Sequence, residues 1–81
     1  MSDYSVRYIH KIRPSEKDVG PDVYLGSNDF LDRKTLAAAL RERRILCSGE
    51  RLNDYRIVEP GKIVAFPASG IWHSIVLTEK K

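Results

Sequence analysis

The chain has 81 residues, 42% of them hydrophobic, which is enough for one modest core and too little for a second domain. Because a small domain buries a small share of its surface, we expect function on an exposed face or an interface and not in a deep active site. Fourteen Lys and Arg residues against eleven Asp and Glu give a formal net charge of +3, so overall charge alone does not identify nucleic acid as the partner.

Cysteine usage and the distribution of apolar residues narrow the class of protein. Cys47 is the single cysteine, so no internal disulfide can form and no second thiol can begin a zinc site. The first residues lack the apolar run of a signal peptide, and no segment approaches the roughly 20 apolar residues that span a bilayer. We therefore predict a cytoplasmic protein without a membrane segment, a metal or a cofactor.

The N-terminal third predicts two strands separated by a loop. Residues 4–13 follow a period of two, which places Tyr4, Val6 and Tyr8 on one face of a strand. Charged and turn-forming residues make 14–22 a predicted mobile loop. Residues 23–25 then predict a short second strand.

A helix is predicted at about residues 32–44. Four polar residues precede it, namely Ser27, Asn28, Asp29 and Asp32. Their side chains can accept hydrogen bonds from the amides of its first turn, a role that we favour over anion binding there. Leu36 and Leu40 fall on one stripe of the helix and are expected to face the core. After the helix, Gly49 permits the turn that returns the chain to the core.

The last third predicts three strands. Those at 55–58 and 62–66 are joined through Pro60-Gly61, which suits a type II turn. The strand at 71–78 is apolar on both faces, so it is expected to be central or covered twice. Residues 79–81 are expected to form a frayed tail.

These elements predict an α+β fold over residues 1–81 as a single small domain. The order is β-β-α-β-β-β, and short turns between consecutive strands favour mainly antiparallel pairing. One helix should pack on a sheet of four or five strands, because its leucine stripe has no other surface to bury against.

No catalytic arrangement is recognisable in the sequence. Cys47 is the only thiol, and His10 and His73 are the only imidazoles that could activate it. Without a nucleophile, base and orienting group in a known spacing, we predict that the protein is not an enzyme. Cys47 is expected to be a small buried apolar group, and both histidines to be hydrogen-bonded in the core or at an interface.

Basic residues in and after the helix are the main functional signal, since guanidinium groups suit phosphate. Lys34, Arg41 and Arg44 fall on one flank of the leucine stripe, and Arg51 and Arg56 follow in the chain. The hypothesis is that this flank binds RNA or another polyanion. Arg41, Arg44 and Arg51 would contact the phosphates, and Lys34 and Arg56 would support them. The opposing interpretation is that nearby carboxylates neutralise the cluster, namely Glu42, Glu50, Asp54 and Glu59.

Residues 40–52 (LRERRILCSGERL) and 55–64 (YRIVEPGKIV) together resemble the second half of the S4 RNA-binding domain. In that family a basic helix leads to an apolar-x-Asn-Gly-basic turn and then to a strand that ends in Pro-Gly-Asp-apolar. Here Ser48 stands in place of the Asn and Lys62 in place of the Asp, and a strand-like segment replaces the preceding helix. The resemblance implies binding to structured RNA, with Arg41, Arg44 and Arg51 as phosphate contacts.

An alternative function uses the last strand. Trp72 follows a glycine turn, and an indole there is either part of the core or an anchor for a partner. The two-sided apolar strand 71–78 would then make this a protein-interaction or homo-oligomerisation domain, whose partner is another protein or a second copy.

Overall fold

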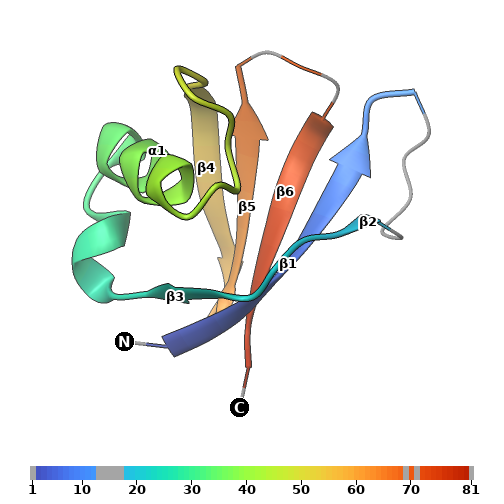
Figure 1. Cartoon of the computed structure of the whole chain (residues 1–81). Helices are drawn as coiled ribbons and strands as arrows, with labels where there is room; N and C mark the ends of the chain where they lie inside the picture. The colour runs from blue at the N-terminus through green and yellow to red at the C-terminus, as the bar shows by residue number, and fades with distance from the viewer. Residues whose placement is uncertain (1, 13–17, 69, 71, 81) are drawn as a thin grey trace.

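One helix covers one face of an antiparallel sheet in the computed structural model, which describes residues 2–12, 18–68, 70 and 72–80 (Figure 1). The strands run in the order β2-β1-β6-β5-β4, and β3 also pairs with β1. The predicted α+β class and antiparallel pairing are confirmed. In chain order the elements are β1 (Ser2–His10), β2 (Asp18–Val19), β3 (Val23–Leu25), the 3-10 helix η1 (Ser27–Phe30), α1 (Arg33–Glu42), β4 (Leu52–Glu59), β5 (Lys62–Pro67) and β6 (Trp72–Glu79).

Helix α1 begins and ends with defined caps. The Asp32 carboxylate accepts a hydrogen bond from the Thr35 amide at 2.7 Å, which confirms the predicted capping role. At the other end, the Ile45 amide donates to the Leu40 carbonyl at 2.9 Å and the Arg44 amide donates to the Arg41 carbonyl at 3.1 Å. This pair of bonds is a Schellman motif, and it ends the helix because Arg44 adopts a left-handed conformation with φ of 61°.

The core lies between α1 and the sheet. Leu36 and Leu40 are fully buried, as the leucine stripe predicts, and they belong to one cluster with Val6, Ile75 and Leu77. Burying one leucine side chain contributes about 2 kcal/mol, so this layer supplies much of the stability of so small a domain.

Strand β6 is the central strand of the sheet. It pairs with β1 on one side and β5 on the other, and Val76 is buried on the face opposite Ile75 and Leu77. The expectation of a central strand is confirmed for the described part, residues 72–78. The turn into β5 is also as predicted, since Gly61 has a φ of 82° after Pro60.

A register shift changes the expected facing at the start of β6. The pairing slips between Ile9 and His10, so His10 pairs with Trp72 and His73 is the extra residue of a bulge. His73 is therefore exposed, so the prediction is wrong for the core, although the ring is hydrogen-bonded, with Nδ1 3.3 Å from the Ser74 hydroxyl. The other half of that prediction, a histidine at an interface, stays a prediction. Cys47 is exposed as well, because it lies in the turn that follows α1 and not on its buried stripe.

Two boundaries differ from the predictions. Of the predicted loop 14–22, residues 14–17 lie outside the described residues, whereas β2 pairs with β1 and the Gly20 amide donates to the Val6 carbonyl at 3.0 Å. The tail was expected to fray from residue 79, but Glu79 ends β6 and the Lys80 amide donates to the Asp3 carbonyl at 2.8 Å. Backbone pairing therefore holds residues 18–20 and 79–80 against the sheet.

Candidate functional site

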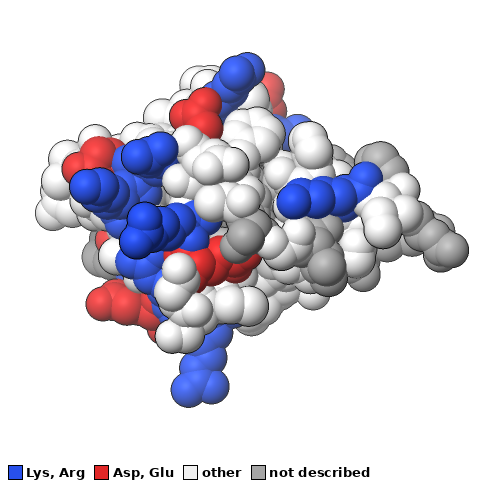
Figure 2. Space-filling view, turned by 90° about the horizontal axis from the view of Figure 1, so that it is seen from above, with Lys and Arg blue, Asp and Glu red and all other residues white. Residues whose placement is uncertain are grey.

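Four cationic side chains line a cleft between α1 and the segment that leads into β4. The cleft has a volume of about 520 Å³. No carboxylate is among the described residues that line it. Figure 2 shows Lys and Arg side chains gathered on the side of the molecule that carries α1. We call this site the basic cleft; its lining residues are Arg33, Lys34, Ala37, Arg41, Gly49, Arg51 and Leu52.

The spacing of residues on α1 explains how the cleft forms. Arg33, Ala37 and Arg41 are four residues apart in turn, so they lie on one face of the helix. The methyl side chain of Ala37 leaves room between the two longer ones. Gly49 has a φ of 80° and turns the chain back, which brings Arg51 to the opposite wall. A Cβ atom at Gly49 would meet nothing within 4 Å, so this wall is open.

Two of the four cations are held by backbone carbonyls. Arg41 Nη1 donates to the Glu50 carbonyl at 2.7 Å, and Arg33 Nη1 donates to the Asn53 carbonyl at 3.0 Å. These acceptors are neutral, so both guanidinium groups keep their charge while their positions are fixed. The Glu50 carboxylate accepts instead from the Cys47 amide at 3.1 Å. The opposing interpretation, in which Glu50 neutralises the cluster by pairing with an arginine, does not describe Arg41.

The other two cations are less constrained, although Lys34 is near enough to the Asp32 carboxylate to help lower its pKa. Lys34 and Arg51 are exposed, and their side chains have neither a hydrogen bond nor an ion pair with any residue described by the structure. A ligand could therefore engage them without displacing a protein partner. Their long side chains would lose rotamer freedom on binding, which limits the gain from each.

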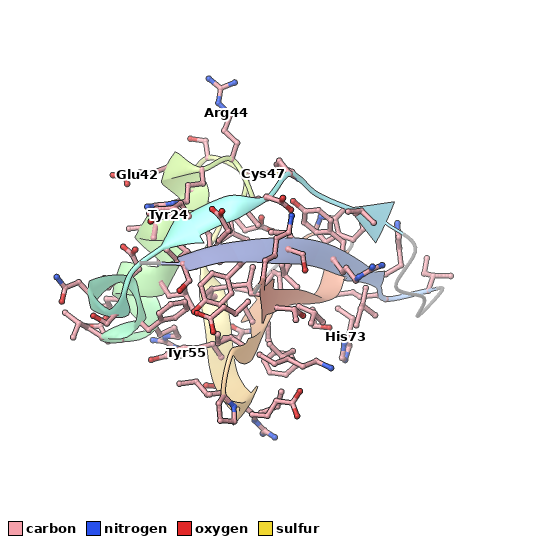
Figure 3. All side chains as sticks on the ribbon, turned by 90° about the horizontal axis from the view of Figure 1, so that it is seen from below. Tyr24, Glu42, Arg44, Cys47, Tyr55 and His73 are labelled. Atoms are coloured by element: carbon pink, nitrogen blue, oxygen red, sulfur yellow. The ribbon has the colours of Figure 1, made fainter. Side chains whose placement is uncertain are left out.

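The remaining predicted site residues lie elsewhere. Arg44 lines a neighbouring hollow of about 590 Å³ that it shares with Arg41 and Gly49, and Figure 3 shows its side chain projecting away from the body of the molecule. Arg56 lies on β4 next to the inward-facing Tyr55, so it points to the sheet face away from α1. There its Nε is 4.0 Å from an Asp54 carboxylate oxygen.

The site thus brings together Lys34, Arg41 and Arg51 from the predicted set and leaves Arg44 and Arg56 out. It adds Arg33, which the sequence hypothesis did not include among the site residues. The signal that could have found it is its four-residue spacing from Ala37 and Arg41, since that spacing stacks side chains on one helical face.

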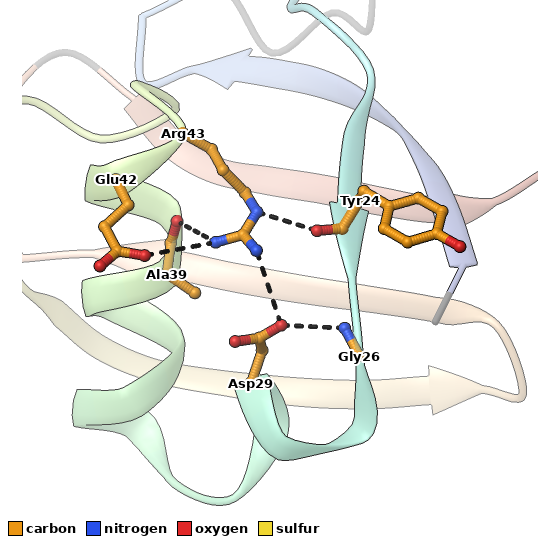
Figure 4. Close-up of polar contacts among 6 residues, drawn as sticks. All are labelled: Tyr24, Gly26, Asp29, Ala39, Glu42 and Arg43. Atoms are coloured by element: carbon orange, nitrogen blue, oxygen red, sulfur yellow. Dashed lines mark hydrogen bonds and ion pairs between the residues drawn. The ribbon is translucent and has the colours of Figure 1, made fainter.

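Arg43 has a structural role, as Figure 4 shows. Its Nε donates to the Tyr24 carbonyl at 2.9 Å and its Nη1 donates to the Ala39 carbonyl at 3.0 Å. The same guanidinium lies 3.9 Å from the Asp29 carboxylate, which itself accepts from the Gly26 amide at 2.9 Å. Arg43 therefore fastens the end of α1 to β3 and η1, and it is not available to a ligand.

Trp72 packs within an aromatic cluster. Its ring centroid lies 4.6 Å from those of both Tyr8 and His10. The Tyr8 hydroxyl donates to the Ile45 carbonyl at 3.4 Å, and burial raises the pKa of this phenol, with the nearby Cys47 and Glu50 adding to the shift. Trp72 is thus partly buried by its own neighbours. Because β6 is paired on both sides, this strand offers no free edge to a partner.

Within the described ranges, no group of three His, Cys, Asp or Glu side chains could hold a metal ion. None of the helices in that part of the chain has the length and apolar character needed to cross a membrane. Comparisons with protein-family models, curated proteins and solved structures found no match to this chain.

Proposed function

We propose that this domain is a non-enzymatic binding module for RNA and that the basic cleft contacts its phosphates. The observation that carries the proposal is the convergence of Arg33, Lys34, Arg41 and Arg51 on one cleft without a carboxylate among the described lining residues. Cations that converge with no carboxylate between them repel one another, so binding an anion there would relieve this repulsion.

The geometry of the arginines suits phosphate. A guanidinium group carries five N–H donors, and the carbonyls of Glu50 and Asn53 engage Nη1 of Arg41 and of Arg33. The remaining donors can form bidentate bonds to phosphate oxygens. Because the two groups are already oriented, less conformational entropy is lost when a ligand binds.

RNA is preferred over other polyanions because of the likeness to the S4 domain. The basic helix, the turn at Gly49 and the strand that ends at Pro60-Gly61 follow one another in the order of that family's pattern, although Ser48 and Lys62 depart from its usual Asn and Asp. In this chain the turn places Arg51 beside the helix, so Arg41, Gly49 and Arg51 both carry the resemblance and line the cleft. Arg33 and Lys34 lie before the residues that resemble the family.

The alternative, a protein-interaction or homo-oligomerisation domain that uses strand 71–78 and Trp72, has weaker support. Among the described residues of that strand, the backbone of β6 is engaged by two neighbours, and Trp72 stacks within the domain. A partner that contacts this strand would therefore have to bind to one face of the sheet. Light scattering would reveal a stable dimer, which is the outcome that homo-oligomerisation requires; interaction with another protein requires no dimer.

The test compares two arginines that differ in location and are matched in charge. Arg51→Gln removes a cation of the basic cleft, whereas Arg56→Gln removes one from the opposite sheet face. Affinity for an RNA hairpin at low salt should fall about tenfold or more in the first variant, because a hydrogen bond between charged groups contributes about 1.5 to 3 kcal/mol. It should change less than about threefold in the second, through long-range charge alone. Equal losses in the two variants would remove the basic cleft from the proposal.

A further inference from the structure

The basic cleft concentrates positive charge, because four cationic side chains line it and no carboxylate is among its described lining residues. One strand of a nucleic-acid duplex carries one negative charge per about 3.4 Å of helix axis, so each nucleotide in the cleft brings one charge. A ligand with more negative charge per phosphorus atom would pair the same cations with a shorter chain.

A terminal polyphosphate has this higher charge density. Each bridging phosphate carries one negative charge, and a terminal phosphate, whose second pKa is about 6, carries nearly two at pH 7. A triphosphate end therefore brings close to four negative charges, which equals the number of cations in the cleft. A polyphosphate chain is also short enough to enter a cleft of this size, whereas an internal backbone segment must run out of it at both ends.

We infer that the basic cleft binds a terminal polyphosphate chain, as found at the 5′ end of an RNA. This inference rests on the proposed RNA-binding function and assigns the part of the RNA that the cleft recognises. Arg33 and Arg41 come from opposite ends of α1, and each is fixed by a carbonyl, Asn53 and Glu50 respectively. They would hold the two ends of the chain, and Lys34 and Arg51 would close on it from the rim.

Gly49 gives the ligand access to the backbone. Because a Cβ atom at this position would have no neighbour within 4 Å, the wall beside Arg51 is unobstructed. A phosphate group can approach this wall closely, since glycine presents no side chain. The absence of aromatic side chains from the described lining residues also fits a ligand that is recognised by charge and not by base stacking.

The experiment measures the affinity of the whole chain for one RNA hairpin prepared with a 5′-triphosphate, a 5′-monophosphate or a 5′-hydroxyl. Ionic strength is matched and no divalent cation is added, since a bound metal would neutralise the phosphates. The triphosphate hairpin should bind at least about tenfold tighter than the 5′-hydroxyl hairpin, because two or more additional charges are paired. Arg51→Gln should reduce this ratio toward one, and Arg56→Gln should leave it unchanged.

Two further probes separate the sources of the polyphosphate. Inorganic tripolyphosphate should displace the triphosphate hairpin at a much lower concentration than orthophosphate at equal ionic strength. If a free nucleoside triphosphate binds as tightly as the triphosphate hairpin, the polyphosphate chemistry is supported and the free nucleotide becomes its source.

The outcomes distinguish this inference from the proposed function. Equal affinities for the three hairpins would overturn the inference while leaving RNA binding intact. Failure of every hairpin to bind would overturn the proposed function. An undiminished triphosphate preference in Arg51→Gln, with that variant folded as judged by its melting temperature, would also overturn the inference, because the preference would then arise outside the basic cleft.

Discussion

Replacing Arg44 by glycine is predicted to stabilise the domain. Arg44 occupies the position after the cap of α1 with a φ of 61°, a left-handed conformation that glycine adopts at no steric cost. For a residue with a Cβ atom this conformation costs about 1 to 2 kcal/mol, and the greater chain entropy that glycine loses on folding offsets about 0.5 to 1 kcal/mol of the gain. The net gain is about 1 kcal/mol, which for a domain of this size raises Tm by about 4 to 8 °C.

The assay is thermal unfolding followed by circular dichroism, with Arg44→Ala as the matched control. Alanine removes the same side chain but keeps the Cβ atom, so its Tm should stay close to that of the parent protein. The side chain of Arg44 makes no hydrogen bond or ion pair within the described residues, so neither variant loses a polar contact. A lower Tm for Arg44→Gly, or an equal rise in both variants, would refute the claim that backbone strain is stored at this residue.

Three further predictions follow from contacts in the fold. Arg43→Gln should lower the free energy of unfolding by about 1 to 3 kcal/mol, because two carbonyls lose a charged donor, and it should speed amide exchange in β3 without changing RNA contacts. Gly20→Ala should lower Tm, since its Cβ atom would lie 2.7 Å from the Tyr8 ring, which is itself packed; an unchanged Tm would show that this ring can move. The Thr35 amide holds the pKa of Asp32 below its ordinary value, so this carboxylate contributes stability above the ordinary pKa that is lost as pH falls through the lowered one. Asp32→Asn should keep a cap near neutral pH and lose this part of the acid dependence, measured by thermal unfolding from pH 2 to 6.

Local signals in the sequence were sufficient for most of the fold. The period of two in β1, the capping carboxylate of Asp32 and the turn at Pro60-Gly61 each depend on neighbouring residues only. Each was therefore predicted at close to its observed position. The central place of β6 was also predictable, because a strand that is apolar on both faces needs cover on both.

Features that depend on pairing between distant segments were missed. The bulge that exposes His73 arises from the register of β6 against β1, some 63 residues away in the sequence, and alternation within β6 alone points to the opposite facing. The exposure of Cys47 depends on the left-handed turn at Arg44, and an arginine in the sequence does not predict such a turn. The two-residue strand β2 is visible only through its partner β1.

The sequence predicted only part of the candidate site, because the rest also depends on how distant segments pack together. Helical spacing was enough to place Lys34 and Arg41 together, but only the turn at Gly49 brings Arg51 to them. Arg56 was assigned to the same group because it is near in sequence, although a strand sends neighbouring side chains to opposite faces. The carbonyls that hold Arg33 and Arg41 could not be predicted, since they depend on where α1 packs against the start of β4.

The salt dependence of RNA affinity tests the central claim most directly. If four cations of the basic cleft neutralise phosphates, the logarithm of the binding constant should fall against the logarithm of salt concentration with a slope of about −3, at about 0.7 to 0.9 per contact. Arg51→Gln should make this slope shallower by about 0.7 to 0.9, and Arg56→Gln should leave it unchanged. Absence of binding at low salt, or a slope that Arg51→Gln and Arg56→Gln alter equally, would contradict the assignment of the basic cleft as the phosphate-binding site.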